Sequence, residues 1–110
     1  MVYLQITAEV PRGKVQEIWG YYRDKIMKYD KECVEKVGGK YIGYWHTEYG
    51  REGEITIMVA YKNIEDREKL LDLMFGTKDK KFHKEYEVWA AYTPNRTVKV
   101  MRPFPESPLQ

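Results

Sequence analysis

Two neighbouring segments, residues 40–49 and 54–61, alternate with a period of two, which is typical of β-strands. The connection between them, residues 50–53, begins and ends with glycine and is typical of a hairpin turn. When the strands are paired with Tyr49 opposite Glu54, large apolar side chains fall on both sides of the hairpin. A sheet with one solvated face would keep them on one side, so this hairpin predicts a sheet that is covered on both faces.

The other segments complete an order of strand, helix, strand, strand, helix, strand. The additional predicted elements are a strand at 2–10, a helix at 14–37, two helical segments at 64–74 and 77–93, and a strand at 96–101. This order predicts an α+β, ferredoxin-like βαββαβ fold, with helices on one face of a four-stranded antiparallel sheet. A second copy would cover the other face, so we expect a homodimeric α/β barrel. Residues 1–102 would form this domain and residues 103–110 an extended, proline-rich arm.

Composition excludes several classes of protein. A net charge of +2, from 19 basic and 17 acidic residues, is too balanced to predict nucleic acid or a membrane as a partner. The single cysteine, Cys33, cannot form an intrachain disulfide, and no leader-like or membrane-length apolar run is present, so we expect a cytoplasmic protein. Abundant Lys and Glu beside few Asn and Gln resemble the composition of proteins from hot environments.

The stretch GYWHTEYGREGEITIMVAYKNIEDREK, residues 43–69, resembles the NIPSNAP family. Members of that family have a G-x-W-x-T-E-x-G strand followed by a V-H-L-W-x-Y strand and a helix with a similar charged turn. The start MVY and the end RPFPESPL also resemble the family. The resemblance implies the dimeric α/β-barrel group of ferredoxin-like folds, which also includes cofactor-free monooxygenases and haem-degrading enzymes. It implies no particular reaction, because the family has no settled one and a fold does not fix a function.

The chain departs from the family pattern at polar positions. Many members begin Y-E-L-R, whereas residues 3–6 here are Y-L-Q-I. The His and Trp of V-H-L-W-x-Y are replaced by Ile57 and Val59, and Tyr61 is kept. If the family pocket depends on the replaced groups, the pocket of this chain is an apolar version of it.

The candidate ligand-binding residues are Tyr44, His46 and Tyr61, and His46 is the candidate catalytic base because histidine titrates near neutral pH. Alternation alone places four aliphatic residues in a helix-covered core: Leu4, Ile6, Ile57 and Val59. Gapless alignment with the family places them in the barrel interior, with Trp45 under the helices. We prefer this second placement, in which the three candidates line the pocket. In the first placement, the pocket is lined instead by Tyr3, Gln5, Thr7, Trp45, Thr47 and Tyr49.

Other residues favour structural roles. His46 and Glu48 could reach one metal ion, but two histidines and one cysteine are too few for a structural zinc site, so neither a metal nor a cofactor is predicted. Cys33 lies on an apolar helical stripe and is expected to be buried and inert. Arg67 is expected on a solvated helix face, with a ligand carboxylate as the alternative partner. The basic segment 78–86 is expected to be solvated rather than to bind RNA or phosphate.

Three functions remain open. The favoured one is the binding of a small apolar or aromatic molecule in the pocket of each subunit. The second is a cofactor-free monooxygenase acting on an aromatic substrate such as a quinol, with Tyr44, His46 and Tyr61 in its site. Haem degradation, with His46 or His83 as the axial ligand, is a weaker variant of it. The third is a protein-interaction module without a pocket function, and the sequence does not decide whether the protein is an enzyme.

Overall fold

A four-stranded antiparallel sheet forms the centre of the computed structural model, which describes residues 1–50, 53–76 and 80–109. Its strands are β1 (Val2–Glu9), β2 (Lys40–His46), β3 (Glu54–Tyr61) and β4 (Asn95–Met101). They lie in the order β2-β3-β1-β4, and each neighbouring pair is antiparallel. The two strands that are most apolar in sequence, β1 and β3, are therefore the inner ones, where both edges are paired.

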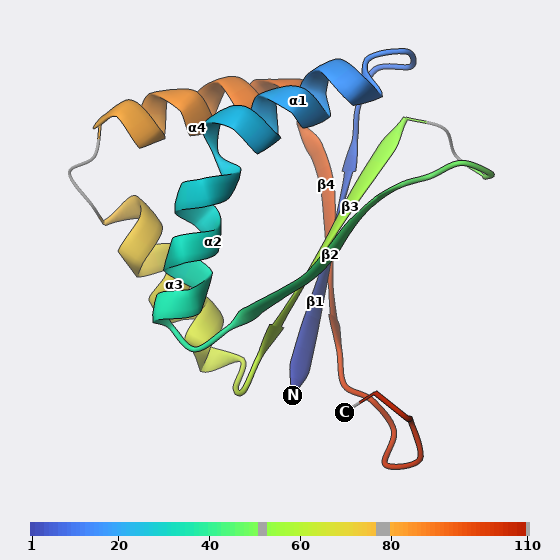
Figure 1. Ribbon diagram of the computed structural model, residues 1–110, viewed down its shortest axis with the longest axis vertical. Coiled ribbons are helices and arrows are strands. Elements are labelled where there is room, and N and C mark those ends of the chain that lie inside the picture. The colour runs from blue at the N-terminus through green and yellow to red at the C-terminus, as the bar shows by residue number, and fades with distance from the viewer. Residues whose placement is uncertain (51–52, 77–79, 110) are drawn as a thin grey trace.

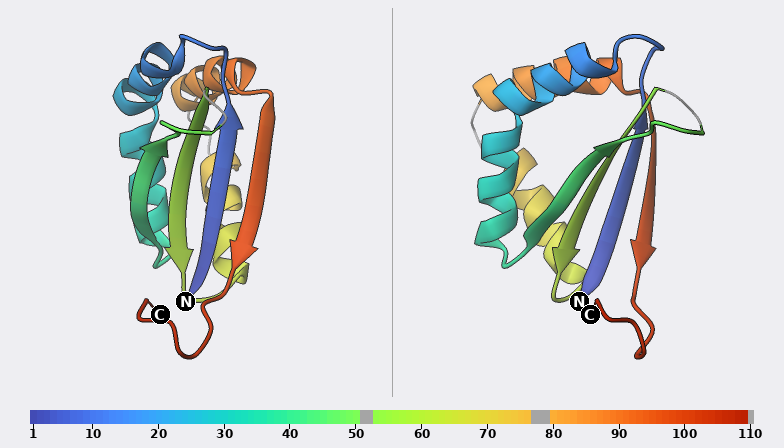
Figure 2. Two further views of the ribbon diagram at one scale, coloured as in Figure 1. Left: turned by 90° about the vertical axis from the view of Figure 1, so that its right-hand side faces the viewer. Right: turned by 45° about the vertical axis from the view of Figure 1, so that its right-hand side comes forward.

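The helices all lie on one side of this sheet (Figure 1). They are α1 (Val15–Lys25), α2 (Met27–Lys36), α3 (Glu65–Phe75) and α4 (Lys80–Tyr92). Figure 2 shows the opposite side, where the strands face the viewer and the described helices lie behind them. We call these two sides the covered face and the open face. The predicted α+β, ferredoxin-like fold is confirmed.

The first helical region is bent rather than continuous. The sequence predicts one helix over residues 14–37, which is wrong, because α1 and α2 meet at Ile26. The backbone hydrogen bonds continue through the bend, from Ile26 to Tyr22 and from Asp30 to Ile26. Ile26 is only 1% exposed, so burial of this side chain fixes the bend, and packing overrides the helical pattern of the sequence. The bend turns α2 so that it packs beside α3 and β2 (Figure 1).

The hairpin register differs from the predicted one by two residues. Trp45 lies opposite Thr56, and Gly43 lies opposite Met58, whereas the sequence predicts Tyr49 opposite Glu54. The reason is that β2 ends at His46, so the connection to β3 is longer than a four-residue turn. A slip of two residues preserves the face of each side chain. Residues 51 and 52 of the predicted turn lie outside the described residues.

The structure decides which residues the helices cover. Leu4, Ile57 and Val59 are at most 5% exposed and belong to one core with helix residues, so their preferred placement in a barrel interior is wrong. Trp45 does not pack under the helices either. It lies on the open face with its ring over Gly43 and is 49% exposed. Aliphatic strand residues face the apolar stripes of the helices, because burial there removes both surfaces from water. This effect decides their placement, and the alignment with the family does not.

The ends of the elements follow local rules. Gly38 has a φ of +80° just after α2, which explains why the helix stops there. At the start of α3, the Asn63 backbone amide donates to Asp66 Oδ2 at 3.4 Å, which is one half of a capping box. Residues 103–109 contain no helix or strand. In the described residues, no helix has both the length and the apolar character needed to cross a membrane.

Candidate functional site

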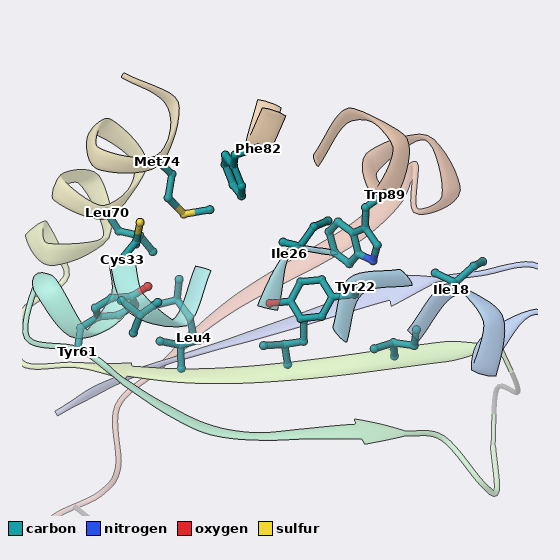
Figure 3. Close-up of a cluster of buried hydrophobic side chains, with 14 of the residues drawn as sticks. Leu4, Ile18, Tyr22, Ile26, Cys33, Tyr61, Leu70, Met74, Phe82 and Trp89 are labelled. Atoms are coloured by element: carbon teal, nitrogen blue, oxygen red, sulfur yellow. The ribbon is translucent and has the colours of Figure 1, made fainter. Parts of the chain in front are cut away.

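A cavity of about 280 Å³ lies between the covered face and the helices. All four strands and all four helices contribute side chains to its wall. Figure 3 shows Leu70 and Met74 pointing from α3 toward the side where Leu4 and Tyr61 of the sheet lie, while Trp89 of α4 points toward Tyr22 of α1. The wall is rich in rings, namely Tyr22, Tyr41, Tyr61, Phe75, Tyr86 and Trp89. A mostly apolar hollow with a few polar groups is the usual form of a small-molecule site.

A partly buried carboxylate, that of Asp30, forms the polar part of the cavity wall. Tyr22 of α1 donates its hydroxyl to Oδ2 of Asp30 in α2 at 2.6 Å, and Tyr41 of β2 donates to the same oxygen. The two tyrosine hydroxyls are 3.0 Å apart. One carboxylate oxygen therefore links three elements, and the bend before α2 is what brings Asp30 to this place.

The surroundings of this cluster alter the pKa of each member. Burial raises the pKa of the Asp30 carboxyl, while the hydrogen bonds from Tyr22 and Tyr41 and the charge of Arg67 act in the opposite direction. Burial, and then the neighbouring Asp30 charge, raise the pKa of both tyrosine hydroxyls. The tyrosines thus stay protonated and serve as hydrogen-bond donors.

Within the described residues, two other buried groups on the cavity wall donate no hydrogen bond to the protein. They are the hydroxyl of Tyr61 and the indole N–H of Trp89, whose residues are 0% and 4% exposed. Burial raises the pKa of Tyr61. The nearby Arg67 guanidinium partly offsets that rise, through its charge and as a donor toward the hydroxyl oxygen, which leaves the hydroxyl proton without an acceptor. A buried polar group without a hydrogen bond is costly, roughly 1–3 kcal/mol, and such groups often mark a site that another molecule completes.

The cavity opens toward β4. Val98 on this edge strand is 50% exposed and Phe75 on α3 is 43% exposed, although both contribute to the wall. Arg96, two residues before Val98 on β4, also lines the cavity. Its guanidinium donates to the Tyr86 hydroxyl at 2.9 Å and lies 5.5 Å from the centre of the Trp89 ring. The mouth therefore combines apolar surface with one fixed positive charge.

A second, shallower pocket of about 400 Å³ lies at the other end of β2 and contains Tyr44 and His46. A row of stacked rings separates it from the cavity. Trp19 lies 5.0 Å from Tyr44 and 5.6 Å from Tyr22, and Tyr41 lies 5.3 Å from Tyr44. Burial raises the pKa of the Tyr44 hydroxyl, which has no hydrogen-bond partner within the described residues.

The three candidate residues are therefore not brought into one site. Tyr61 lines the cavity, while Tyr44 and His46 line the second pocket, and the catalytic role of His46 stays a prediction. Arg67 corrects the expectation of a fully solvated helix face, because it is half-buried and lines the cavity. Cys33 is buried as predicted, and burial raises the pKa of its thiol. No group of three metal-ligating side chains occurs in the described residues.

Sequence reasoning missed Asp30, Tyr22 and Tyr41 as site residues. One signal was present: Tyr22 and Ile26 continue to Asp30 at a spacing of four, which puts a carboxylate on an apolar helical stripe. The signal for Tyr41 was weaker: Gly43 interrupts the strand, and an isolated glycine there often marks a bulge. A bulge between Tyr41 and Gly43 shifts the alternation, so Tyr41 shares the covered face with Tyr44.

Fold and geometry together define a class: a ferredoxin-like α+β protein with an apolar cavity between its sheet and its helices. The NIPSNAP family model matches residues 10–108, so the chain belongs to the NIPSNAP family. Members of this family have no settled function, and the match confirms the resemblance in the sequence. A comparison with curated proteins gave no match.

Solved structures show the same fold. A NIPSNAP family protein of unknown function from Agrobacterium tumefaciens has a TM-score of 0.87 and 20% identity, covering 100% of this chain and 94% of that chain. An uncharacterised NIPSNAP domain protein from Burkholderia xenovorans has a TM-score of 0.81 and 17% identity, covering 98% and 99%. A protein from Nitrosomonas europaea, proposed to be an antibiotic biosynthesis monooxygenase, has a TM-score of 0.64 and 11% identity, covering 94% and 98%. At these identities the likeness establishes the fold alone.

Proposed function

We propose that the protein binds a small ring compound in the cavity between the covered face and the helices. The observation that carries this proposal is a pair of buried donors on cavity-lining residues, the Tyr61 hydroxyl and the Trp89 indole N–H, which find no acceptor among the described residues. Six aromatic rings form much of the remaining wall, and flat apolar molecules pack well against such surfaces. A ligand with one or two hydrogen-bond acceptors would satisfy the two donors.

The direct test is native mass spectrometry of freshly purified protein, which reports the subunit count and any retained molecule together. Added ring compounds are then screened by thermal shift. Val98→Trp should fill the mouth of the cavity. It should therefore abolish both the retention of a co-purified molecule and the rise in melting temperature caused by added ring compounds. Val100→Trp is the matched control, because Val100 lies two residues along the same strand with a similar exposure, 48%, but does not line the cavity. Equal binding by the two variants would contradict the proposal.

We also propose that the partner on the open face is a second copy of this chain. This face has a half-exposed Trp45 and a central row of uncharged side chains, including Thr7 and Thr56, whose hydroxyls are 3.4 Å apart. An uncharged row with an exposed indole, in the middle of a sheet that carries charges such as Glu9, Glu54 and Lys99 further out, is better suited to another protein surface than to water. The sheet of a second copy offers the same uncharged row, which a two-fold dimer would pair with itself.

A further inference from the structure

The inference concerns the chemical class of the ligand and rests on the proposed function. Asp30 uses one carboxylate oxygen for both tyrosine hydroxyls. Within the described residues, its other oxygen, Oδ1, has no hydrogen-bond partner. Asp30 lines the cavity, so this oxygen can accept a hydrogen bond from a molecule inside it.

A positive charge stands close to that carboxylate. Arg67 on α3 lines the same cavity and influences the pKa of both Asp30 and Tyr61, so its guanidinium lies near both groups. It forms no ion pair within the described residues. A guanidinium offers several donors in one plane, which suits a carboxylate or carbonyl oxygen. The Tyr61 hydroxyl beside it adds a further donor.

The cavity therefore offers an acceptor next to donors within an aromatic enclosure. A ligand with only an acidic group would leave Oδ1 of Asp30 unsatisfied and would place two negative charges near each other. A ligand with only a hydroxyl would leave Arg67 and Tyr61 unsatisfied. A ring that carries both groups fulfils both requirements at once.

We propose that the ligand is an aromatic hydroxy acid or hydroxy ketone. Its hydroxyl donates to Oδ1 of Asp30, and its carboxylate or carbonyl oxygen accepts from Arg67 and the Tyr61 hydroxyl. Its ring lies among the aromatic side chains of the wall, including Tyr22 and Trp89. Arg96 at the mouth favours the approach of an acidic molecule.

The test is isothermal titration calorimetry with four probes: meta-hydroxybenzoate, meta-methoxybenzoate, meta-hydroxybenzamide and toluene. We expect the wild-type protein to prefer the hydroxyl over the methoxy probe by about tenfold or more, because the methoxy group cannot donate to Asp30. Asp30→Asn should reduce this preference strongly, and Arg67→Met should reduce the preference for the acid over the amide. Glu32→Gln, an exposed change on the same helix, is the control and should keep both preferences.

The outcomes separate this inference from the proposed function. Suppose that toluene binds to the wild-type protein but not to Val98→Trp, and that the hydroxyl and methoxy probes bind equally well to the wild-type protein. The ligand class is then overturned, while the cavity remains a binding site. If Asp30→Asn keeps the full hydroxyl preference, the role of Asp30 is overturned. If no probe binds and no molecule is retained after purification, both proposals fail. If Asp30→Asn does not fold, Arg67→Met still tests the ligand class through the preference for the acid over the amide. This variant should fold, because Arg67 lies at the edge of the core.

Discussion

The two faces of the sheet are made from the same strands but have opposite surroundings. On the covered face, Leu4 is 1% exposed and Tyr61 is 0% exposed, and side chains from the helices pack against them. On the open face, Trp45 is 49% exposed, and the described helices lie behind the sheet when this face is viewed (Figure 2). Changes on the covered face should therefore alter the free energy of unfolding and ligand binding. Changes on the open face should alter association between copies.

The largest effect is expected for Tyr22→Ala on the covered face. Tyr22 is 2% exposed, contacts the rings of Trp19 and Trp89, and donates to Asp30. Its loss creates a void and removes one donor from a partly buried carboxylate, so the free energy of unfolding should fall by about 3–5 kcal/mol. Urea unfolding followed by circular dichroism measures this change. Tyr49→Ala is the control, because Tyr49 is 90% exposed, and it should shift stability by less than about 0.5 kcal/mol.

The next effect should appear in assembly rather than in stability. Trp45→Lys places a charge on the open face, on the edge strand β2, and removes its exposed indole. If a second copy covers this face, the dimer should weaken by roughly 2 kcal/mol or more, about thirtyfold in Kd. Light scattering across a dilution series measures the association. Val100→Lys, a similarly exposed position on the other face, should leave the Kd unchanged, and equal effects of both variants would contradict the comparison.

Two glycines give a matched pair for the same comparison. A Cβ at Gly39 would lie 2.9 Å from Val34 Cγ1 and 3.0 Å from the Tyr61 ring, and these buried groups cannot move away. Gly39→Ala should therefore cost about 1–3 kcal/mol of unfolding free energy. A Cβ at Gly43 would lie 2.8 Å from the outer edge of the Trp45 ring, which is free to swing into solvent in a single subunit.

Gly43→Ala should therefore affect association between copies and leave the free energy of unfolding of the monomer almost unchanged. In a dilute, monomeric sample it should change the unfolding free energy by less than about 0.5 kcal/mol. In a dimer, the displaced Trp45 ring should weaken association. Comparable losses of stability for Gly39→Ala and Gly43→Ala in the monomer would show that the open face is packed more tightly than the structure indicates.

The fold was predictable because two simple periods repeat along the chain. Alternation in β1 and β3 and the apolar stripes of the helices specify the strand–helix order, and the glycine after α2 specifies a helix end. The site was less predictable, because it depends on two local departures from those periods. The bend at Ile26 positions Asp30, and the bulge after Tyr41 turns Tyr41 toward it. The bend has no glycine or proline to indicate it and arises from tertiary packing, whereas Gly43 beside the bulge marks that place without specifying its direction.

The smallest expected effect is a dependence of stability on pH that originates in Asp30. Burial raises its pKa in the folded protein above the ordinary value of 3.8, so the folded state holds the proton more tightly than the unfolded state. This contribution to stability is complete below pH 3.8 and is lost as the pH rises through the raised pKa of the folded protein. Asp30→Asn removes the titration, so the stability of the wild-type protein relative to the variant should decrease with rising pH.

Urea unfolding of both proteins between about pH 4 and pH 7 measures that difference. The groups that face Asp30 decide its sign: Tyr22, Tyr41 and Arg67 favour the charged carboxylate, whereas burial favours the neutral acid. A wild-type advantage that grows with pH would mean that the two hydroxyls and the guanidinium outweigh burial. The covered face would then hold a stable, enclosed negative charge throughout this pH range, whereas the charged side chains of the open face, such as Glu9 and Lys99, belong to an uncovered surface.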